Sequence, residues 1–244
     1  MAAFTHVLTD IEGTTTAIAF VHRSLFPYAA SALEPFLARH SGEPEVAAVL
    51  AEVPGKDKPA QIRAWMAADA KVTPLKALQG LIWREGYKAG DLQGHLWPDV
   101  APALRDWHAR GLHLAIYSSG SEEAQRLLVR HSEAGDLEPL FEGFFDTRMG
   151  MKREAASYTN IARAWGAEPA AILFLSDIAE ELDAARQAGL ATCQLVRCRG
   201  RHQALRPPSA GRRFWGCDIA AVGVTGPCCA VRTNPTATAE SRTC

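Results

Sequence analysis

Two acidic residues two positions apart, Asp10 and Glu12, have residue types that fit phosphoryl-group chemistry. Asp10 directly follows residues 4–9, a short apolar run rich in β-formers that is typical of a buried strand. Residues two positions apart at a strand end point the same way, so Asp10 can attack phosphorus while Glu12 transfers a proton. The pattern predicts Asp10 as a covalent nucleophile and Glu12 as its acid–base partner.

Three further polar residues complete this chemistry. Ser118 and Ser119 follow a second apolar run and precede a helical pattern, where hydroxyl and backbone N–H groups can bind a phosphoryl oxygen. Lys152 lies in a turn before another helical pattern and supplies a fixed positive charge. That charge can pair with Asp10 and offset the charge of a phosphoryl group in the transition state.

A third apolar run, residues 171–175, ends at Ser176 and Asp177. Carboxylate oxygens are the ligands that hard cations prefer, so Asp10 and Asp177 together predict a Mg²⁺ site. Each motif alone has a plainer explanation: an acidic turn at Asp10, a helix cap at Ser118 and a solvated surface lysine at Lys152. Their placement on successive strand ends favours a catalytic site.

The elements that must position these residues alternate between strand and helix. Strands are expected at residues 4–9, 112–117, 141–145, 171–175 and 191–196, and helices at 100–110, 122–131, 155–165 and 179–188. This order predicts an α/β fold with a doubly wound parallel sheet. Such sheets bind ligands beyond the carboxyl ends of their strands, which is where the polar residues fall.

Residues 24–90 differ, because their apolar residues recur at helical spacing throughout. We expect an inserted helical cap subdomain there, an α/β core from residues 1–23 and 91–197, and an atypical, disordered tail at 198–244. Pro35 falls within a helical pattern, so that helix is expected to kink or restart.

Composition excludes several classes of protein. The net charge is −1, and the basic tail, with seven Arg against Asp218 and Glu240, lacks the aromatic interleaving of a nucleic-acid-binding arm. Five of the six cysteines lie in that tail at spacings that match neither a disulfide framework nor a zinc site. No apolar run reaches the roughly 18 residues of a membrane span, and the start lacks signal-peptide features. We expect a cytoplasmic protein that binds neither nucleic acid nor membrane.

Combined motifs over residues 4–197 resemble the haloacid dehalogenase superfamily and, within it, the enolase-phosphatase E1 family of methionine salvage. They are Asp-Ile-Glu-Gly-Thr-Thr-Thr at 10–16, Phe-Val at 20–21, Leu-Phe-Pro-Tyr at 25–28, Leu-Trp-Pro-Asp-Val at 96–100, Tyr-Ser-Ser-Gly-Ser at 117–121 and Leu-Phe-Leu-Ser-Asp at 173–177. The resemblance implies a monomer with one Mg²⁺ per subunit.

By this resemblance, Asp10, Asp177 and the backbone carbonyl of Glu12 hold the metal, and Ser118, Ser119 and Lys152 contact the substrate. Glu181 is a lower-ranked candidate that helps to orient the metal's surroundings. The implied reaction converts 2,3-diketo-5-methylthiopentyl-1-phosphate to its enol phosphate and then hydrolyses it to acireductone. Glu12 is the leading candidate for the enolising base, and the cap is expected to close over the site.

Three alternatives stay open at this point. A generic phosphatase of the same superfamily would hydrolyse a sugar phosphate or phosphoglycolate without enolising it. A dehalogenase would need no magnesium and would have less use for the acidic residues. A non-catalytic scaffold would bind acidic partners through the tail, which departs from the family after Arg197, where Pro-Gly is expected and Cys198 and Arg199 stand instead.

Overall fold

The computed structural model describes residues 4–197 and 229–232. Its sheet has six strands in the order β3-β2-β1-β4-β5-β6. They are β1 (His6–Thr9), β2 (His113–Tyr117), β3 (Gly143–Phe145), β4 (Ile172–Ser176), β5 (Ala191–Arg197) and β6 (Cys229–Arg232). The first five are parallel, and β6 pairs antiparallel with β5. The predicted α/β fold with a doubly wound parallel sheet is confirmed.

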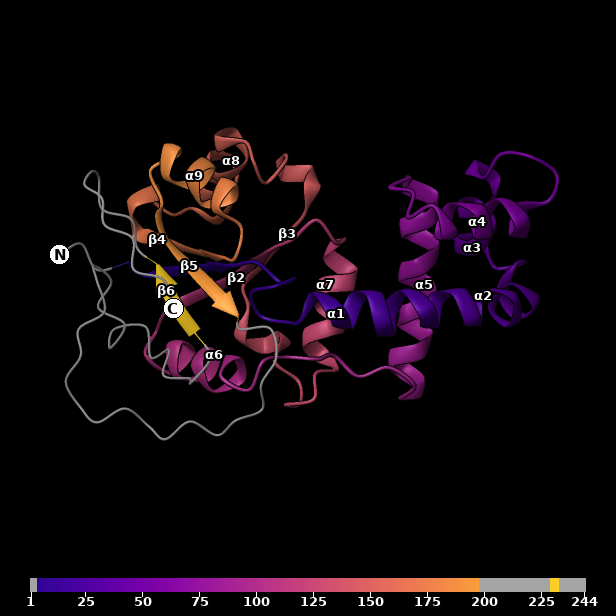
Figure 1. The fold of residues 1–244 in the computed structure, drawn as a ribbon, viewed down its shortest axis with the longest axis horizontal. Helices are drawn as coiled ribbons and strands as arrows, with labels where there is room; N and C mark the ends of the chain where they lie inside the picture. The colour runs from indigo at the N-terminus through magenta and orange to yellow at the C-terminus, as the bar shows by residue number, and fades with distance from the viewer. Residues whose placement is uncertain (1–3, 198–228, 233–244) are drawn as a thin grey trace.

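Helices cover both faces of the sheet, as Figure 1 shows. One face is covered by α6 (Val100–Ala109) and α7 (Glu122–Arg130), and the other by α8 (Ala155–Trp165) and α9 (Ala179–Gln187). Because successive strand side chains point to opposite faces, Val7 packs into the first core and Leu8 into the second. Short 3₁₀ turns at Glu138–Leu140, Thr147–Met149 and Pro169–Ala171 complete the connections.

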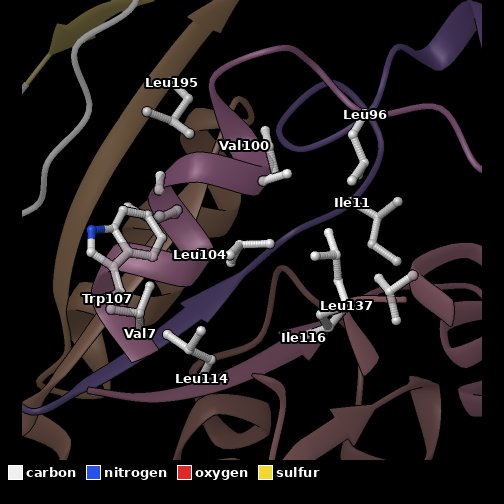
Figure 2. Close-up of a cluster of buried hydrophobic side chains, with 14 of the residues drawn as sticks. Val7, Ile11, Leu96, Val100, Leu104, Trp107, Leu114, Ile116, Leu137 and Leu195 are labelled. Carbon is white, nitrogen blue, oxygen red and sulfur yellow. The ribbon is translucent and has the colours of Figure 1, made fainter. Parts of the chain in front are cut away.

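The core under α6 is built around Trp107 and Leu104, which lie against side chains of the central strands (Figure 2). Val7, Leu114 and Leu195 come from β1, β2 and β5, respectively. All of these side chains are buried. Their packing fixes the central strand, and with it the position of the residues that follow β1.

A helical subdomain lies at one end of the sheet, on the right in Figure 1. It follows α1 (Ile18–Phe20) and a π-helical stretch (Val21–Leu25) and contains α2 (Phe26–His40), α3 (Pro44–Glu52), α4 (Lys58–Ala67) and α5 (Thr73–Ala89). These helices share a hydrophobic cluster of their own. The division of the chain at residues 24–90 stays a prediction, and this separate cluster supports it.

Helix α2 runs from Phe26 to His40 through Pro35, so the helix does not restart there, and the alternative expectation of a kink stays a prediction. A proline costs the helix one backbone hydrogen bond, and the burial of Leu33, Phe36 and Leu37 on the same helix compensates for it.

Most of the predicted tail, residues 198–228 and 233–244, lies outside the described residues. The exception is β6, four residues that extend the edge of the sheet. Within residues 4–197 and 229–232, no helix combines the length and the apolar character that crossing a bilayer requires.

Replacement of Trp107 by alanine is expected to lower the free energy of unfolding by about 3–5 kcal/mol, because it removes a large buried ring and leaves a cavity under α6. Urea denaturation measures the change. The neighbouring exposed His108→Ala is the control, with an expected change of at most about 0.5 kcal/mol. Equal losses in the two variants would contradict the assignment of Trp107 to the core.

Candidate active site

A buried cluster of one lysine and two carboxylates lies at the carboxyl end of the central strand. Lys152 Nζ lies 2.5 Å from Asp10 Oδ1 and 2.8 Å from Glu181 Oε2. Ser176 donates a hydrogen bond of 2.9 Å to the same Glu181 oxygen. The structure therefore brings together Asp10 and Lys152, as predicted. It also places Glu181 in direct contact with Lys152, a more central position than its lower rank in the sequence analysis implied.

Strands β1, β3 and β4 of the same sheet supply this convergence. Asp10 follows β1, which lies between β2 and β4, and the lysine comes from the segment after β3. Register places Thr9 beside Leu175 of β4, so Asp177 lies just beyond the same edge as Asp10. Parallel strands aligned in this way present their following residues on one side of the sheet.

Burial controls the charges of the cluster. It raises the pKa of Asp10 from 3.8 to about 7, although the ammonium of Lys152 acts in the opposite direction. Burial also acts to lower the pKa of Lys152, but the carboxylates of Asp10 and Glu181 outweigh it and the pKa is raised. The lysine thus keeps its positive charge, while Asp10 without a metal ion holds its proton more readily than an exposed carboxyl group.

Thr14 connects Asp10 with Asp177. Its Oγ1 lies 3.4 Å from Asp10 Oδ2 and 3.3 Å from Asp177 Oδ1, and it accepts a 3.0 Å hydrogen bond from the Asp177 backbone N–H. Burial raises the pKa of Asp177 as well. One fully buried hydroxyl therefore lies within hydrogen-bond distance of two carboxylates from distant parts of the sequence and can donate its proton to either.

Gly13 makes this approach possible. Its φ is +86°, and a Cβ there would lie 2.2 Å from Asp177 Oδ2. Only glycine combines the left-handed backbone with the missing side chain that Asp177 requires. The loop is also held from outside, because Arg197 donates to the Thr14 carbonyl at 2.9 Å and to Asp99 at 2.6 Å.

The oxygen atoms at this edge fit a hard divalent cation. Asp10 and Asp177 offer carboxylates, and no backbone N–H of the described chain donates to the carbonyl of Glu12, two residues after Asp10. No three His, Cys, Asp or Glu side chains within residues 4–197 and 229–232 form a metal cluster. Two carboxylates and a carbonyl suit Mg²⁺, which usually keeps several of its water ligands.

The remaining predicted residues lie near the cluster but do not bond to it. Ser118 is buried after β2, where its N–H donates to the Phe145 carbonyl and its Oγ accepts from the Gly120 N–H. Ser119 is exposed, and Glu12 is half-buried with no side-chain partner among the described residues. An exposed Ser119 and an unpaired Glu12 remain available to a ligand.

Sequence reasoning missed Thr14, Ser176 and the need for glycine at position 13. A signal was present for Thr14 and Gly13, because glycine followed by three threonines after an acidic pair indicates a tight turn with hydroxyl donors. Ser176 lies in the 173–177 motif, but its type and position gave no sign that its fully buried side chain would donate to Glu181.

Comparison with known proteins shows which family of proteins this chain resembles. The pattern of haloacid dehalogenase-like hydrolases matches residues 4–189. "Enolase-phosphatase E1" of Granulibacter bethesdensis is 59% identical over 210 residues, which cover 84% of this chain and 91% of that protein. The protein of the same name from Pseudomonas aeruginosa strain UCBPP-PA14 is 56% identical and covers 78% and 89%, respectively. The crystal structure of the UTR4 protein of Saccharomyces cerevisiae is 34% identical, with a TM-score of 0.71, and the match covers 86% of this chain and 96% of that one.

Because a Cβ at position 13 would clash with Asp177, Gly13→Ala is expected to lower the free energy of unfolding more than Gly55→Ala, as measured by urea denaturation. Both glycines have φ of +86°, but nothing lies within 4 Å of a Cβ at Gly55. The left-handed backbone alone is expected to cost about 1–2 kcal/mol in each variant. A further loss of about 2 kcal/mol is expected at Gly13 from displacement of Asp177. Equal losses would show that Asp177 does not depend on Gly13.

Burial of Asp10 predicts a pH-dependent effect of Asp10→Asn on the metal-free protein. The folded protein holds the Asp10 proton up to about pH 7, whereas the unfolded chain loses it near 3.8. The wild type therefore loses stability relative to the Asp10→Asn variant as pH rises between these values, and above about pH 7 the loss is complete. Thermal unfolding with a chelator should show the variant gaining about 3 kcal/mol between about pH 5 and about pH 8.

The exposed Asp183→Asn controls for exchange of a carboxylate for an amide. If the stability gain of Asp10→Asn stays constant across this range, the proton is not held by the folded state.

Proposed function

The chain belongs to the enolase-phosphatase E1 family of haloacid dehalogenase-like hydrolases, and we propose that it converts 2,3-diketo-5-methylthiopentyl-1-phosphate to acireductone and phosphate in methionine salvage. The family identifies the substrate class as a small phosphorylated molecule and the enzyme class as a phosphatase. The single observation that carries the assignment to this site is the buried Asp10–Lys152 pair at the carboxyl edge of the sheet.

Hydrolysis proceeds through Asp10. A carboxylate oxygen forms a bond to phosphorus, the bond from phosphorus to the substrate oxygen breaks, and the leaving oxygen takes a proton from Glu12. Water then attacks the aspartyl phosphate, with Glu12 accepting its proton, and releases phosphate. Lys152 holds a fixed positive charge beside the reacting oxygen.

Enolisation comes first and needs a base near the carbon next to the carbonyl group. Glu12 is our candidate, because its half-buried side chain has no partner among the described residues. Ser118 and Ser119 would bind the phosphoryl oxygens at the neighbouring strand end. Both steps then use one set of residues at one edge of the sheet.

The family implies a divalent metal ion, and we propose one Mg²⁺ held by Asp10, Asp177 and the Glu12 carbonyl. When bound, Mg²⁺ supplies positive charge that stabilises an enolate oxygen and offsets the charge of the phosphoryl group. Burial alone raises the pKa of Asp10, so the positive charge of the cation, together with the Lys152 ammonium, would favour the ionised, nucleophilic carboxylate.

We also propose that helices α2–α5 form a cap that excludes water from the site and contacts the methylthio end of the substrate. The protein is proposed to act as a cytoplasmic monomer. Size-exclusion chromatography with light scattering would test the monomer, since a dimer would double the mass.

Parallel assays of the diketo phosphate, by ultraviolet absorbance of the enol and by released phosphate, test the function. The wild type with Mg²⁺ should give both signals, and a chelator should abolish both. Asp10→Asn should lose phosphate release by at least about 10³-fold, because the amide cannot attack phosphorus. Asp183→Asn, an exposed carboxylate outside the cluster, is the matched control.

Phosphate release from unrelated esters without any enol signal would favour a generic phosphatase. Folded protein without either activity would favour a non-catalytic scaffold. Full activity of Asp10→Asn would show that Asp10 is not the nucleophile.

A further inference from the structure

The segment that carries Lys152 has no strand and no α-helix of its own. We call residues 149–152 the lysine loop; it begins at the last residue of the short 3₁₀ turn Thr147–Met149 and precedes α8. Its last residue places a buried ammonium between Asp10 and Glu181. A loop with a free backbone would not hold a charge at a fixed position, so some other contact must fix it.

Four side chains supply that contact, one for each successive carbonyl of the loop. The hydrogen bonds run from Asn160 Nδ2 to Met149 (3.0 Å), from the Tyr117 hydroxyl to Gly150 (2.9 Å), from Ser157 Oγ to Met151 (2.7 Å) and from the Tyr158 hydroxyl to Lys152 (2.7 Å). Three of the donors lie on α8 and one on β2. Side chains of α8 and β2 thus take the place of the backbone partners that a helix or strand would give.

The two tyrosines are rigid donors. Both side chains are fully buried, and their rings pack edge to face at 5.5 Å, with Phe174 at 5.1 Å from Tyr158. Burial raises the pKa of both phenols, so they stay protonated and donate their hydrogen bonds. Each hydroxyl is therefore held by the core of the protein, not by the loop that it contacts.

The four contacts are not equivalent. The Met151 carbonyl also accepts from the Glu154 backbone N–H at 3.0 Å, so it keeps a partner without Ser157. The Lys152 carbonyl has Tyr158 as its only donor among the described residues. Gly150 allows the close packing, since a Cβ there would lie 2.2 Å from Ser157 Oγ. Tyr158 is the contact on which the lysine depends most.

We propose that Tyr158, supported by Tyr117, Ser157 and Asn160, is a positioning residue that fixes the Lys152 ammonium against Asp10 through the backbone of the lysine loop. The proposal rests on the role of Lys152 in the proposed function. A charge that is fixed before the substrate binds stabilises the transition state without reorganisation, and a displacement of about 1 Å can cost about 10²-fold in rate.

Tyr158→Phe tests this, because it removes the hydroxyl and keeps the ring in the core. In the holoenzyme with Mg²⁺, kcat for phosphate release is expected to fall about tenfold while KM changes by less than about twofold. Ser157→Ala should cause a smaller fall, since Met151 keeps its second donor. Tyr87→Phe is the matched control, because its buried hydroxyl has no partner among the described residues and lies in the cap helix α5.

A second measurement follows the lysine itself. The holoenzyme is treated with a lysine-acylating reagent, and the acylation rates of Lys152 and Lys58 are measured by peptide mass spectrometry. Lys58, partly buried in the cap with its ammonium on the Val53 carbonyl, is the internal reference. Tyr158→Phe should accelerate acylation of Lys152 about tenfold and leave Lys58 unchanged, because only the loop opens more often.

Wild-type kcat and an unchanged Lys152 acylation rate in Tyr158→Phe would overturn the proposal. Equal acceleration at Lys152 and Lys58 would overturn it too, since the hydroxyl would then stabilise the whole fold. If the wild type itself releases no phosphate, the proposed function fails, while the acylation rates still decide whether Tyr158 fixes the lysine.

Discussion

The buried ion pair between Asp10 and Lys152 is the interaction on which the rest of the site depends. Removing an ion from water costs several kcal/mol, so burial raises the pKa of Asp10, and the Lys152 ammonium within hydrogen-bond distance acts against this effect. Glu181 adds a second negative charge beside the same ammonium, and Ser176 donates to it. Asp10 is thus held in place before any ligand binds, and a bound cation would offset its negative charge in place of the excluded water.

The sheet meets this constraint by its strand order. β1 lies at the centre, so the residue after it is surrounded by the ends of β2 and β4 and is shielded from solvent on both sides. The two hydrophobic cores above and below the sheet make β1 rigid. Rigid strands carry the acidic residues, whereas the lysine arrives on a loop whose carbonyls must be held by side chains.

The second constraint is the proximity of the Asp10 and Asp177 carboxylates, and small residues in the loop after β1 make that proximity possible. Gly13 leaves room for Asp177, and the Thr14 hydroxyl lies within hydrogen-bond distance of both acids. Arg197 ties this loop to Asp99 in the segment that leads back from the helical subdomain.

The sequence by itself determined the fold class and the residues at the strand ends. Its alternating apolar runs specify strands and helices, because burial of one face or one stripe imposes a period of 2.0 or 3.6 residues. Polar residues after those runs, Asp10, Ser118 and Asp177, were therefore placed correctly at one edge of the sheet. The family resemblance of the motifs was likewise readable from residues alone.

Only the tertiary structure decided which of these residues touch. Glu181 and Asp10 both pair with Lys152, and Thr14 lies beside two acids from distant parts of the chain. The side chains of Glu12 and Ser119, in contrast, form no hydrogen bond or ion pair with another described residue. Periodicity could not give these pairings, because they depend on strand order and on the exact positions of side chains. Periodicity also could not show that helix α2 continues through Pro35, where burial of neighbouring apolar residues outweighs the lost hydrogen bond. Nor could it show the bond from the Tyr158 hydroxyl to the Lys152 carbonyl, which forms only when α8 packs on the sheet.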